Sequence, residues 1–119
     1  MTIRNICLLI FLSASVAEPA FATVKKGKRE VLIDNDKVEL VRLTYPPGTE
    51  SGMHTHIHPH RTVYFVKGGQ LKLVPADTSK SAKNIRVKDG DVLYLPATTH
   101  NVINVGATQV IIIENEIKG

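Results

Sequence analysis

Short apolar runs separated by turn-forming residues limit the fold of this chain more than any other feature of its sequence. No helical period of useful length appears after residue 22. Glycine, proline, asparagine or aspartate separates most neighbouring runs, a pattern typical of β-strands joined by turns. The runs that we interpret as strands are Val31–Ile33, Val38–Tyr45, Thr62–Lys67, Gln70–Val74, Ile85–Val87, Val92–Leu95, Val102–Val105 and Gln109–Ile113.

The turns and the apolar composition together predict an all-β fold. Gly68 and Gly69 lie between two of the runs and predict a tight hairpin, because such turns need positive φ. The lysine-rich stretch Pro75–Asn84 is expected to be a surface loop. Tryptophan is absent and only three Phe and three Tyr occur, so the core must come mainly from Val, Ile and Leu, which favour strands. Many short strands with regular turns favour a closed barrel or a sandwich.

Residues 1–22 differ from the rest and resemble a secretory signal peptide. Arg4 precedes the apolar run Ile6–Val16, and Ala20–Ala22 places small residues at the positions that a signal peptidase inspects. The run is shorter than the roughly 20 residues that a membrane-spanning helix needs, so no stable membrane insertion is expected after cleavage. We therefore predict cleavage after Ala22 and a periplasmic or secreted protein. The only cysteine, Cys7, would leave with the signal.

The remaining chain is expected to form one domain. Residues 23–36 are interpreted as an N-terminal arm and first strand, and residues 37–119 as a β-barrel domain. The net charge is +4, and four basic residues in the arm account for much of it. No motif pairs these charges with stacking aromatic residues, so a solvated arm is favoured and no nucleic-acid partner is expected.

Four of the five histidines occupy alternate positions in one short segment: His54, His56, His58 and His60. In an extended chain alternate side chains leave the same face, about 6.6–7 Å apart along the strand. Two imidazoles at this spacing can lean onto one ion, since a metal–nitrogen bond measures about 2 Å. The fifth, His100, follows a strand that ends at Leu95. A solvated histidine-rich loop with adventitious metal affinity is the simpler alternative.

The histidine pattern resembles two motifs of the cupin superfamily. The first motif, G-x5-H-x-H-x3,4-E-x6-G, matches Gly48, His54 and His56, with His60 four positions later where the family has glutamate. The second, G-x5-P-x-G-x2-H-x3-N, is similar to Gly90 and Pro96 followed by His100 and Asn104, although Thr98 replaces a glycine and His100 comes one residue early. The resemblance covers roughly residues 38–114. It implies a small jelly-roll-like β-barrel with a metal inside one mouth.

The resemblance also implies a ligand set of His54, His56, His60 and His100. His58 would then contact the pocket without binding the metal. A second register makes His56 and His58 the paired histidines and puts Thr62 in the fourth place, which threonine fills poorly. Imidazole ligands suit divalent Fe, Ni, Cu or Zn, and cupins also use Mn, so the metal's identity stays open.

Two functions follow from such a site. The first is a metal-dependent enzyme, an oxygenase or isomerase for example, acting on a small polar organic molecule at the barrel mouth. The second is a non-catalytic module in which the metal is structural or the barrel binds a ligand. Glu50, Arg61 and Tyr64 flank the histidines and are explained equally well as substrate contacts or as ordinary strand residues. A homodimer is also expected, with the apolar strand Gln109–Ile113 as a candidate for its face.

Overall fold

A computed structural model describes residues 23–119, and the predicted signal peptide lies outside the described residues. The described part of the chain contains nine strands and no helix. No helix long and apolar enough to cross a membrane occurs in residues 23–119. The strands are β1 (Lys28–Asp34), β2 (Val38–Tyr45), β3 (His54–His56), β4 (His60–Lys67), β5 (Gly69–Pro75), β6 (Lys83–Val87), β7 (Val92–Leu95), β8 (Thr98–Asn104) and β9 (Val110–Ile117).

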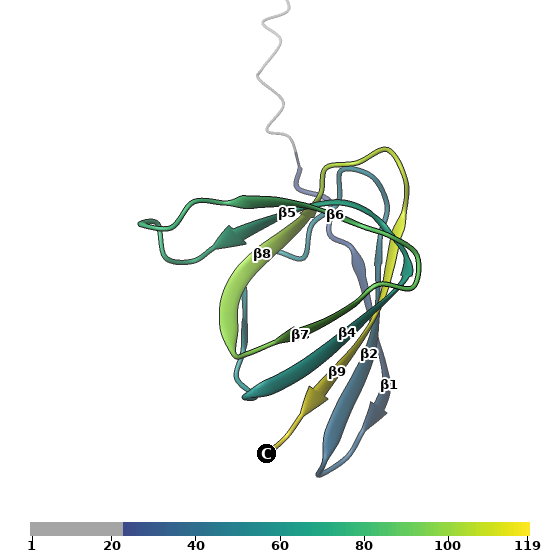
Figure 1. The fold of residues 1–119 in the computed structure, drawn as a ribbon, viewed down its shortest axis with the longest axis vertical. Coiled ribbons are helices and arrows are strands. Elements are labelled where there is room, and N and C mark those ends of the chain that lie inside the picture. Colours follow the sequence, from purple (N-terminus) through teal and green to yellow (C-terminus); the bar gives the residue numbers. More distant parts are fainter. Residues whose placement is uncertain (1–22) are drawn as a thin grey trace, which may run out of the picture.

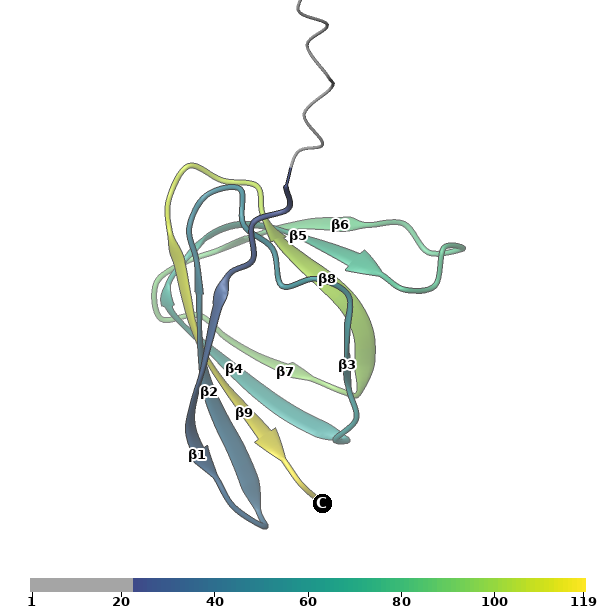
Figure 2. The same ribbon diagram turned by 180° about the vertical axis from the view of Figure 1, so that it is seen from behind.

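The strands form two antiparallel sheets that face each other around a common interior (Figures 1 and 2). The first sheet has the order β1-β2-β9-β4-β7, and the second has the order β3-β8-β5-β6. Strands distant in sequence are therefore neighbours, as in the pairs of β2 with β9 and β3 with β8. The prediction of an all-β jelly-roll-like barrel is confirmed.

The core lies between the sheets and is built from alternate residues of the strands. In β4 the odd-numbered residues Val63 and Phe65 are buried, whereas the even-numbered Thr62 and Tyr64 are exposed. Successive side chains of a strand point to opposite faces of the sheet, so the buried odd-numbered residues mark the face that is turned towards the core. Leu71, Val102, Val110 and Ile112 complete the cluster with Tyr45 and Val87. Aromatic residues thus add to the aliphatic core that composition predicts.

The predicted hairpin at Gly68 and Gly69 is wrong. β4 pairs with β7 and β9, whereas β5 pairs with β6 and β8, so the chain crosses from one sheet to the other at this point. Neither glycine has a positive φ. Glycine is needed at position 68 for a different reason, because a β-carbon there would overlap the Val87 carbonyl group. A close approach of two backbones, and not a hairpin turn, explains the residue.

Asn104, at the end of β8, fastens three segments of the barrel. Its side-chain amide donates to the carbonyl groups of Tyr45, at 2.7 Å, and Thr108, at 2.8 Å. Its side-chain oxygen accepts a hydrogen bond from the Gly106 amide at 2.9 Å. Asn104 is 1% exposed, and its hydrogen bond to the Tyr45 carbonyl is fully buried, so removal of the side chain leaves that carbonyl without a partner.

We therefore expect Asn104→Ala to lower the free energy of unfolding by about 3 kcal/mol, since three backbone groups, one of them in a fully buried hydrogen bond, lose a partner. Urea denaturation followed by circular dichroism measures the change. Asn84→Ala, at an exposed position of β6, is the matched control and is expected to change stability by less than about 0.5 kcal/mol. Equal effects of the two variants would contradict the assigned role of Asn104.

Candidate metal centre

Three histidines converge inside the barrel because β3 pairs with β8. The antiparallel register sets His54 directly opposite His100 and leaves His56 two positions along β3, on the same face. The Nε2 atoms of His54 and His56 are 2.8 Å apart, and those of His56 and His100 are 3.2 Å apart. Nitrogen atoms that share one metal at bonds of about 2.0–2.1 Å lie roughly 3 Å from one another, so the spacing fits a shared ion.

The hydrogen-bond partners of the Nδ1 atoms determine whether the Nε2 atoms of His54 and His56 carry a hydrogen or a lone pair. His54 Nδ1 lies 2.8 Å from the Gly52 carbonyl oxygen, which accepts only, so Nδ1 must donate. His56 Nδ1 donates in the same way to the carboxylate of Glu116. A neutral ring that donates through Nδ1 carries a lone pair on Nε2. Two lone pairs therefore face each other across 2.8 Å, an arrangement that a cation between them stabilises.

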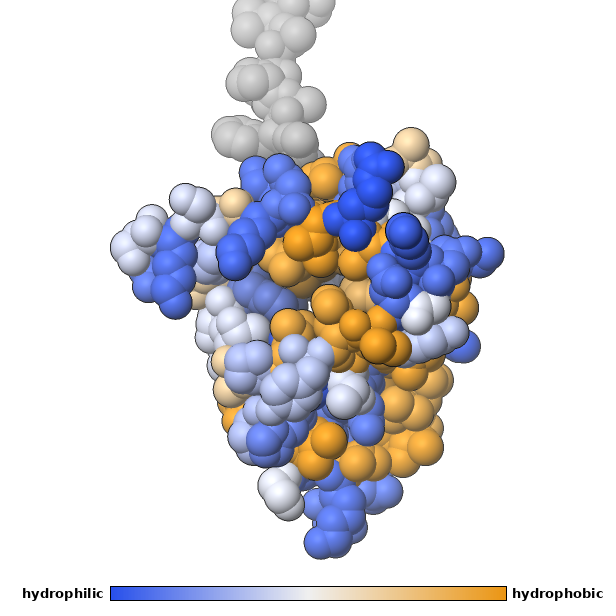
Figure 3. Space-filling view, viewed as in Figure 1, coloured by the Kyte–Doolittle hydropathy of each residue, from blue (hydrophilic) through white to orange (hydrophobic). Residues whose placement is uncertain are grey.

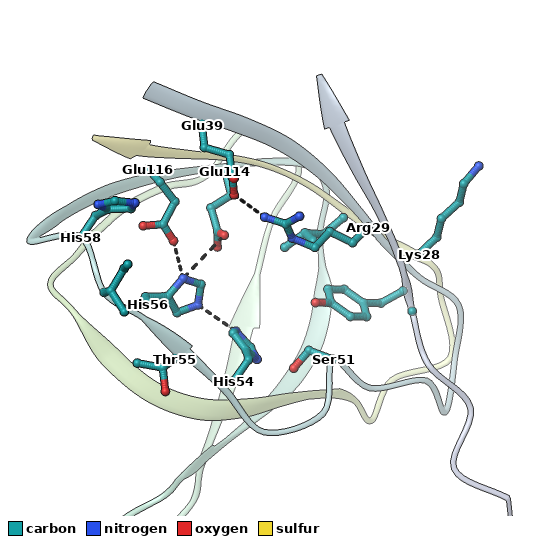
Figure 4. Close-up of a pocket in the computed structure, with 14 residues that line it drawn as sticks. Lys28, Arg29, Glu39, Ser51, His54, Thr55, His56, His58, Glu114 and Glu116 are labelled. Carbon is teal, nitrogen blue, oxygen red and sulfur yellow. Dashed lines mark hydrogen bonds and ion pairs between the residues drawn. The ribbon is translucent and has the colours of Figure 1, made fainter. Parts of the chain in front are cut away.

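Two carboxylates of β9 lie next to the Nδ1 side of the His56 ring (Figure 4). Glu116 accepts from His56 Nδ1, and an oxygen of Glu114 lies 3.9 Å from the same nitrogen. Both carboxylates are buried, with 8% and 5% of Glu114 and Glu116 exposed. A carboxylate on the far nitrogen of a histidine orients the ring and makes it a stronger metal ligand. His56, Glu114 and Glu116 also lie close enough to one another to form a second cation-binding group.

Burial and neighbouring charges shift the ionisation of this site. Burial, with smaller contributions from the neighbouring rings of His54 and His56, lowers the pKa of His100 to about 3. Burial, followed by the positive charge of Arg61, likewise lowers the pKa of His56 to about 3. These rings are therefore neutral at physiological pH, which is the form that binds a metal. Burial raises the pKa of Glu114 to about 7, although Arg61 opposes this shift.

Arg61 also points into the barrel, where its side chain is 1% exposed. Its Nη1 lies 3.4 Å from Glu114 Oε2, whereas Nε and Nη2 are buried without a hydrogen-bond partner. Arg61 lies five positions after His56, and Gly68 lies seven positions after Arg61. The longer spacing of the first motif therefore puts Arg61, not His60, in the place of the family's glutamate, with Gly68 at its glycine.

The structure does not bring His60 to the other three histidines. His60 begins β4, is exposed, and its Nδ1 contacts the hydroxyl group of Tyr94. The next residue, Arg61, faces inward, so strand alternation turns His60 outward. Of the four predicted ligands, the structure thus brings His54, His56 and His100 together and leaves His60 apart from them.

The second register is not supported either. His58 lies in the bend between β3 and β4 and lines the barrel mouth without joining the three rings (Figure 4). Thr62 is exposed on the outer face of β4. The placement of His58 agrees with the expectation that it contacts the pocket only.

Two cavities meet at the histidines. The first, of about 370 Å³, opens at the end of β1 and β3 and is lined by polar residues that include Arg29, Glu39, His58 and Glu116. The second, of about 460 Å³, has mostly apolar walls with Arg61 and His100 at its inner end. β7 is an edge strand of the first sheet and β6 is an edge strand of the second, and the two are not paired with each other. Apolar side chains gather where β7 passes below β5 and β6 (Figure 3).

Glu114 and Glu116 were not predicted as site residues, although the sequence carries a signal for them. β9 continues to Ile117, beyond the predicted end at Ile113. Its buried residues are Val110, Ile112, Glu114 and Glu116, a strict period of two. Carboxylates that continue the inward face of an apolar strand predict a buried polar site, just as the alternate histidines do.

Comparisons with known proteins agree with this architecture. The family model described as "Cupin domain" matches residues 41–114. The β-alanine degradation protein BauB of Pseudomonas aeruginosa is 32% identical over 89 residues, which cover 74% of this chain and 90% of that protein. A cupin domain from Bordetella pertussis Tohama I has a similar structure, with a TM-score of 0.72 and 29% identity over 81% of this chain and 97% of that one.

A protein with a double-stranded β-helix domain from Klebsiella pneumoniae gives a TM-score of 0.64 at 20% identity, covering 86% of this chain and 83% of that one, and shows the fold alone. The sheets and the inward-facing histidine cluster define a small double-stranded β-helix with a candidate metal site. The chain belongs to the cupin family.

Proposed function

We propose that this cupin binds one divalent transition metal through His54, His56 and His100 and is a metal-dependent enzyme acting on a small polar organic molecule. The observation that carries the proposal is the close approach of three Nε2 atoms, with 2.8 Å between those of His54 and His56 and 3.2 Å between those of His56 and His100. Neutral imidazole ligands suit Fe, Ni, Cu and Zn, and Mn is a further candidate. The bound ion would supply Lewis acidity.

Three ligands favour catalysis over a structural role. Structural zinc sites are closed by four protein ligands, whereas catalytic sites keep a position open for water or substrate. His60, the expected fourth ligand, lies outside the cluster, and cavities adjoin the three rings. The protein's own residues would orient the site: Gly52 and Glu116 hold the rings of His54 and His56. Oxygenase and isomerase chemistry both suit an open site of this kind.

The relative from Pseudomonas aeruginosa is named for degradation of β-alanine, which is a small polar organic molecule. The name supports small-molecule chemistry for this chain as well.

Export to the periplasm or the medium is part of the proposal. It rests on the charge, apolar run and small residues of positions 1–22, and predicts a mature N-terminus at Thr23.

We expect the purified protein to bind one equivalent of Ni²⁺, and single alanine variants of His54, His56 or His100 to lose at least about 100-fold in affinity, as loss of a ligand predicts. Competition with a chromophoric chelator measures the affinity. His60→Ala is the matched control, since it removes an exposed histidine four residues from His56, and it should bind like the parent protein. A loss in His60→Ala as large as that in His100→Ala would contradict the three-histidine site.

An open coordination position can be tested with Co²⁺ in place of the native ion. Azide added to the Co²⁺-loaded protein is expected to change its visible absorption in a saturable way, because azide can occupy a position that protein ligands leave free. An unchanged spectrum at saturating azide would favour the structural alternative. The same titration on His60→Ala should match the parent protein.

The proposal includes a homodimer formed through the outer face of β9. β9 lies between β2 and β4 with both edges paired, so only its face is free to contact a second copy. Tyr64 lies opposite Ile113 and Val92 in the adjoining strands, and Tyr64 and Val92 are 47% and 70% exposed. Cross-strand neighbours share one face, so they form a continuous apolar surface.

Ile113→Glu is expected to convert the dimer to a monomer, because it would place a carboxylate within the buried surface. Light scattering coupled to gel filtration measures the mass. Lys72→Glu, on the other sheet, is the control and should leave the dimer intact. A monomeric mass for the parent protein would reject this part of the proposal.

A further inference from the structure

The guanidinium group of Arg61 is the buried charged group whose hydrogen bonds are least satisfied. Nη1 contacts Glu114, but Nε and Nη2 have no partner, although Arg61 is 1% exposed. Buried charges are ordinarily paired and hydrogen-bonded, because an unpartnered donor costs free energy. Arg61 lines the apolar cavity together with His54 and His100. Arg61 is therefore part of the wall of a cavity that also reaches the histidines.

The two unpartnered nitrogens have a specific geometry. Nε and Nη2 form the side of the guanidinium group on which two N–H bonds point in parallel. This side matches the two oxygens of a carboxylate, and such paired hydrogen bonds are among the strongest that proteins form. Glu114 occupies Nη1 and leaves this side free. The arrangement is that of a receptor for one carboxylate.

The rest of the cavity indicates what the carboxylate is attached to. Its walls carry the side chains of Leu71, Leu73, Ile85, Leu93 and Leu95 among others. A volume of about 460 Å³ suits a small organic molecule. The charge of the site also favours a carboxylate. A divalent ion and Arg61 together carry one more positive charge than Glu114 and Glu116 carry negative charge when both carboxyl groups are ionised. A monoanion would make the site neutral.

We infer that the ligand of this cupin is a monocarboxylic acid with an apolar body, and that its carboxylate binds Nε and Nη2 of Arg61. The inference deepens the proposed function by naming the class of substrate, and it rests on that function for the ion towards which the other end of the molecule points. Arg61 is then a specificity-determining residue at the position where the family's motif has a glutamate.

The test compares hexanoate with hexanamide, which have the same length and differ in charge. We expect hexanoate to bind at least about tenfold more tightly, as a charge-assisted pair of hydrogen bonds predicts. Dissociation constants are measured by NMR titration of both Ni²⁺-loaded and metal-free protein. Binding in the metal-free form separates this inference from the proposed metal site, because a carboxylate held by the ion would lose its preference when the ion is removed.

Two variants that differ only at Arg61 identify the receptor. Glu114→Gln keeps the guanidinium and frees Nη1, so its preference for hexanoate should persist or increase. The double variant Arg61→Gln with Glu114→Gln removes both members of the Arg61–Glu114 ion pair together, so neither is left unpaired, which protects its folding, and it should bind hexanoate and hexanamide equally. Circular dichroism melting curves check that both variants fold.

Three results would overturn the inference: equal binding of the two probes to the parent protein, a preference that survives loss of Arg61, or a preference confined to the Ni²⁺-loaded form. The last two would leave the metal site intact. Conversely, failure of His54, His56 and His100 to bind Ni²⁺ alongside an Arg61-dependent preference would reject the metal site and retain the carboxylate receptor.

Discussion

The pairing of β3 with β8 is the constraint on which the candidate site depends. β3 has only three residues, yet its register with β8 sets His54 opposite His100 and keeps His56 on the same face. Beyond the His54–His100 end of this contact, the Ser51 hydroxyl group accepts a hydrogen bond from the Val102 amide, and Asn104 donates to the Tyr45 carbonyl and accepts from the Gly106 amide. A slip of β3 by one residue would turn His54 and His56 to the opposite face, away from His100, so the chemistry of the site is set by strand register.

The interior of the barrel carries more charge than stability alone would favour. Arg61, Glu114 and Glu116 are buried, and each of their charges costs several kcal/mol to remove from water before its partners compensate. Apolar residues of similar volume would fill the same space at lower cost. The contacts of these residues fit a binding site better than a purely structural role. Glu116 orients His56, Glu114 lies between His56 and Arg61, and Nε and Nη2 of Arg61 have no partner. Clusters of this kind are typical of functional sites.

Most of the fold could be predicted from the sequence, because strand period and turn residues are local signals. Period two also identified His54 and His56 as neighbours on one face. The errors arose where long-range pairing decides the outcome. Gly68 resembles a hairpin glycine locally, but its place is explained by the Val87 backbone of a distant segment. Arg61, and not His60, faces inward because β4 begins at His60 and buries its odd-numbered residues, whereas the sequence predicted a strand that begins only at Thr62. Glu114 and Glu116 become site residues only because β9 is central and faces β3 across the interior.

Anomalous diffraction from crystals of the Ni²⁺-loaded protein tests the central claim most directly. The account predicts one strong anomalous peak about 2.0–2.2 Å from the Nε2 atoms of His54, His56 and His100, with at least one further ligand that is not a protein side chain. A peak bound by His60, or one held by Glu114 and Glu116 without His54 and His100, would contradict it.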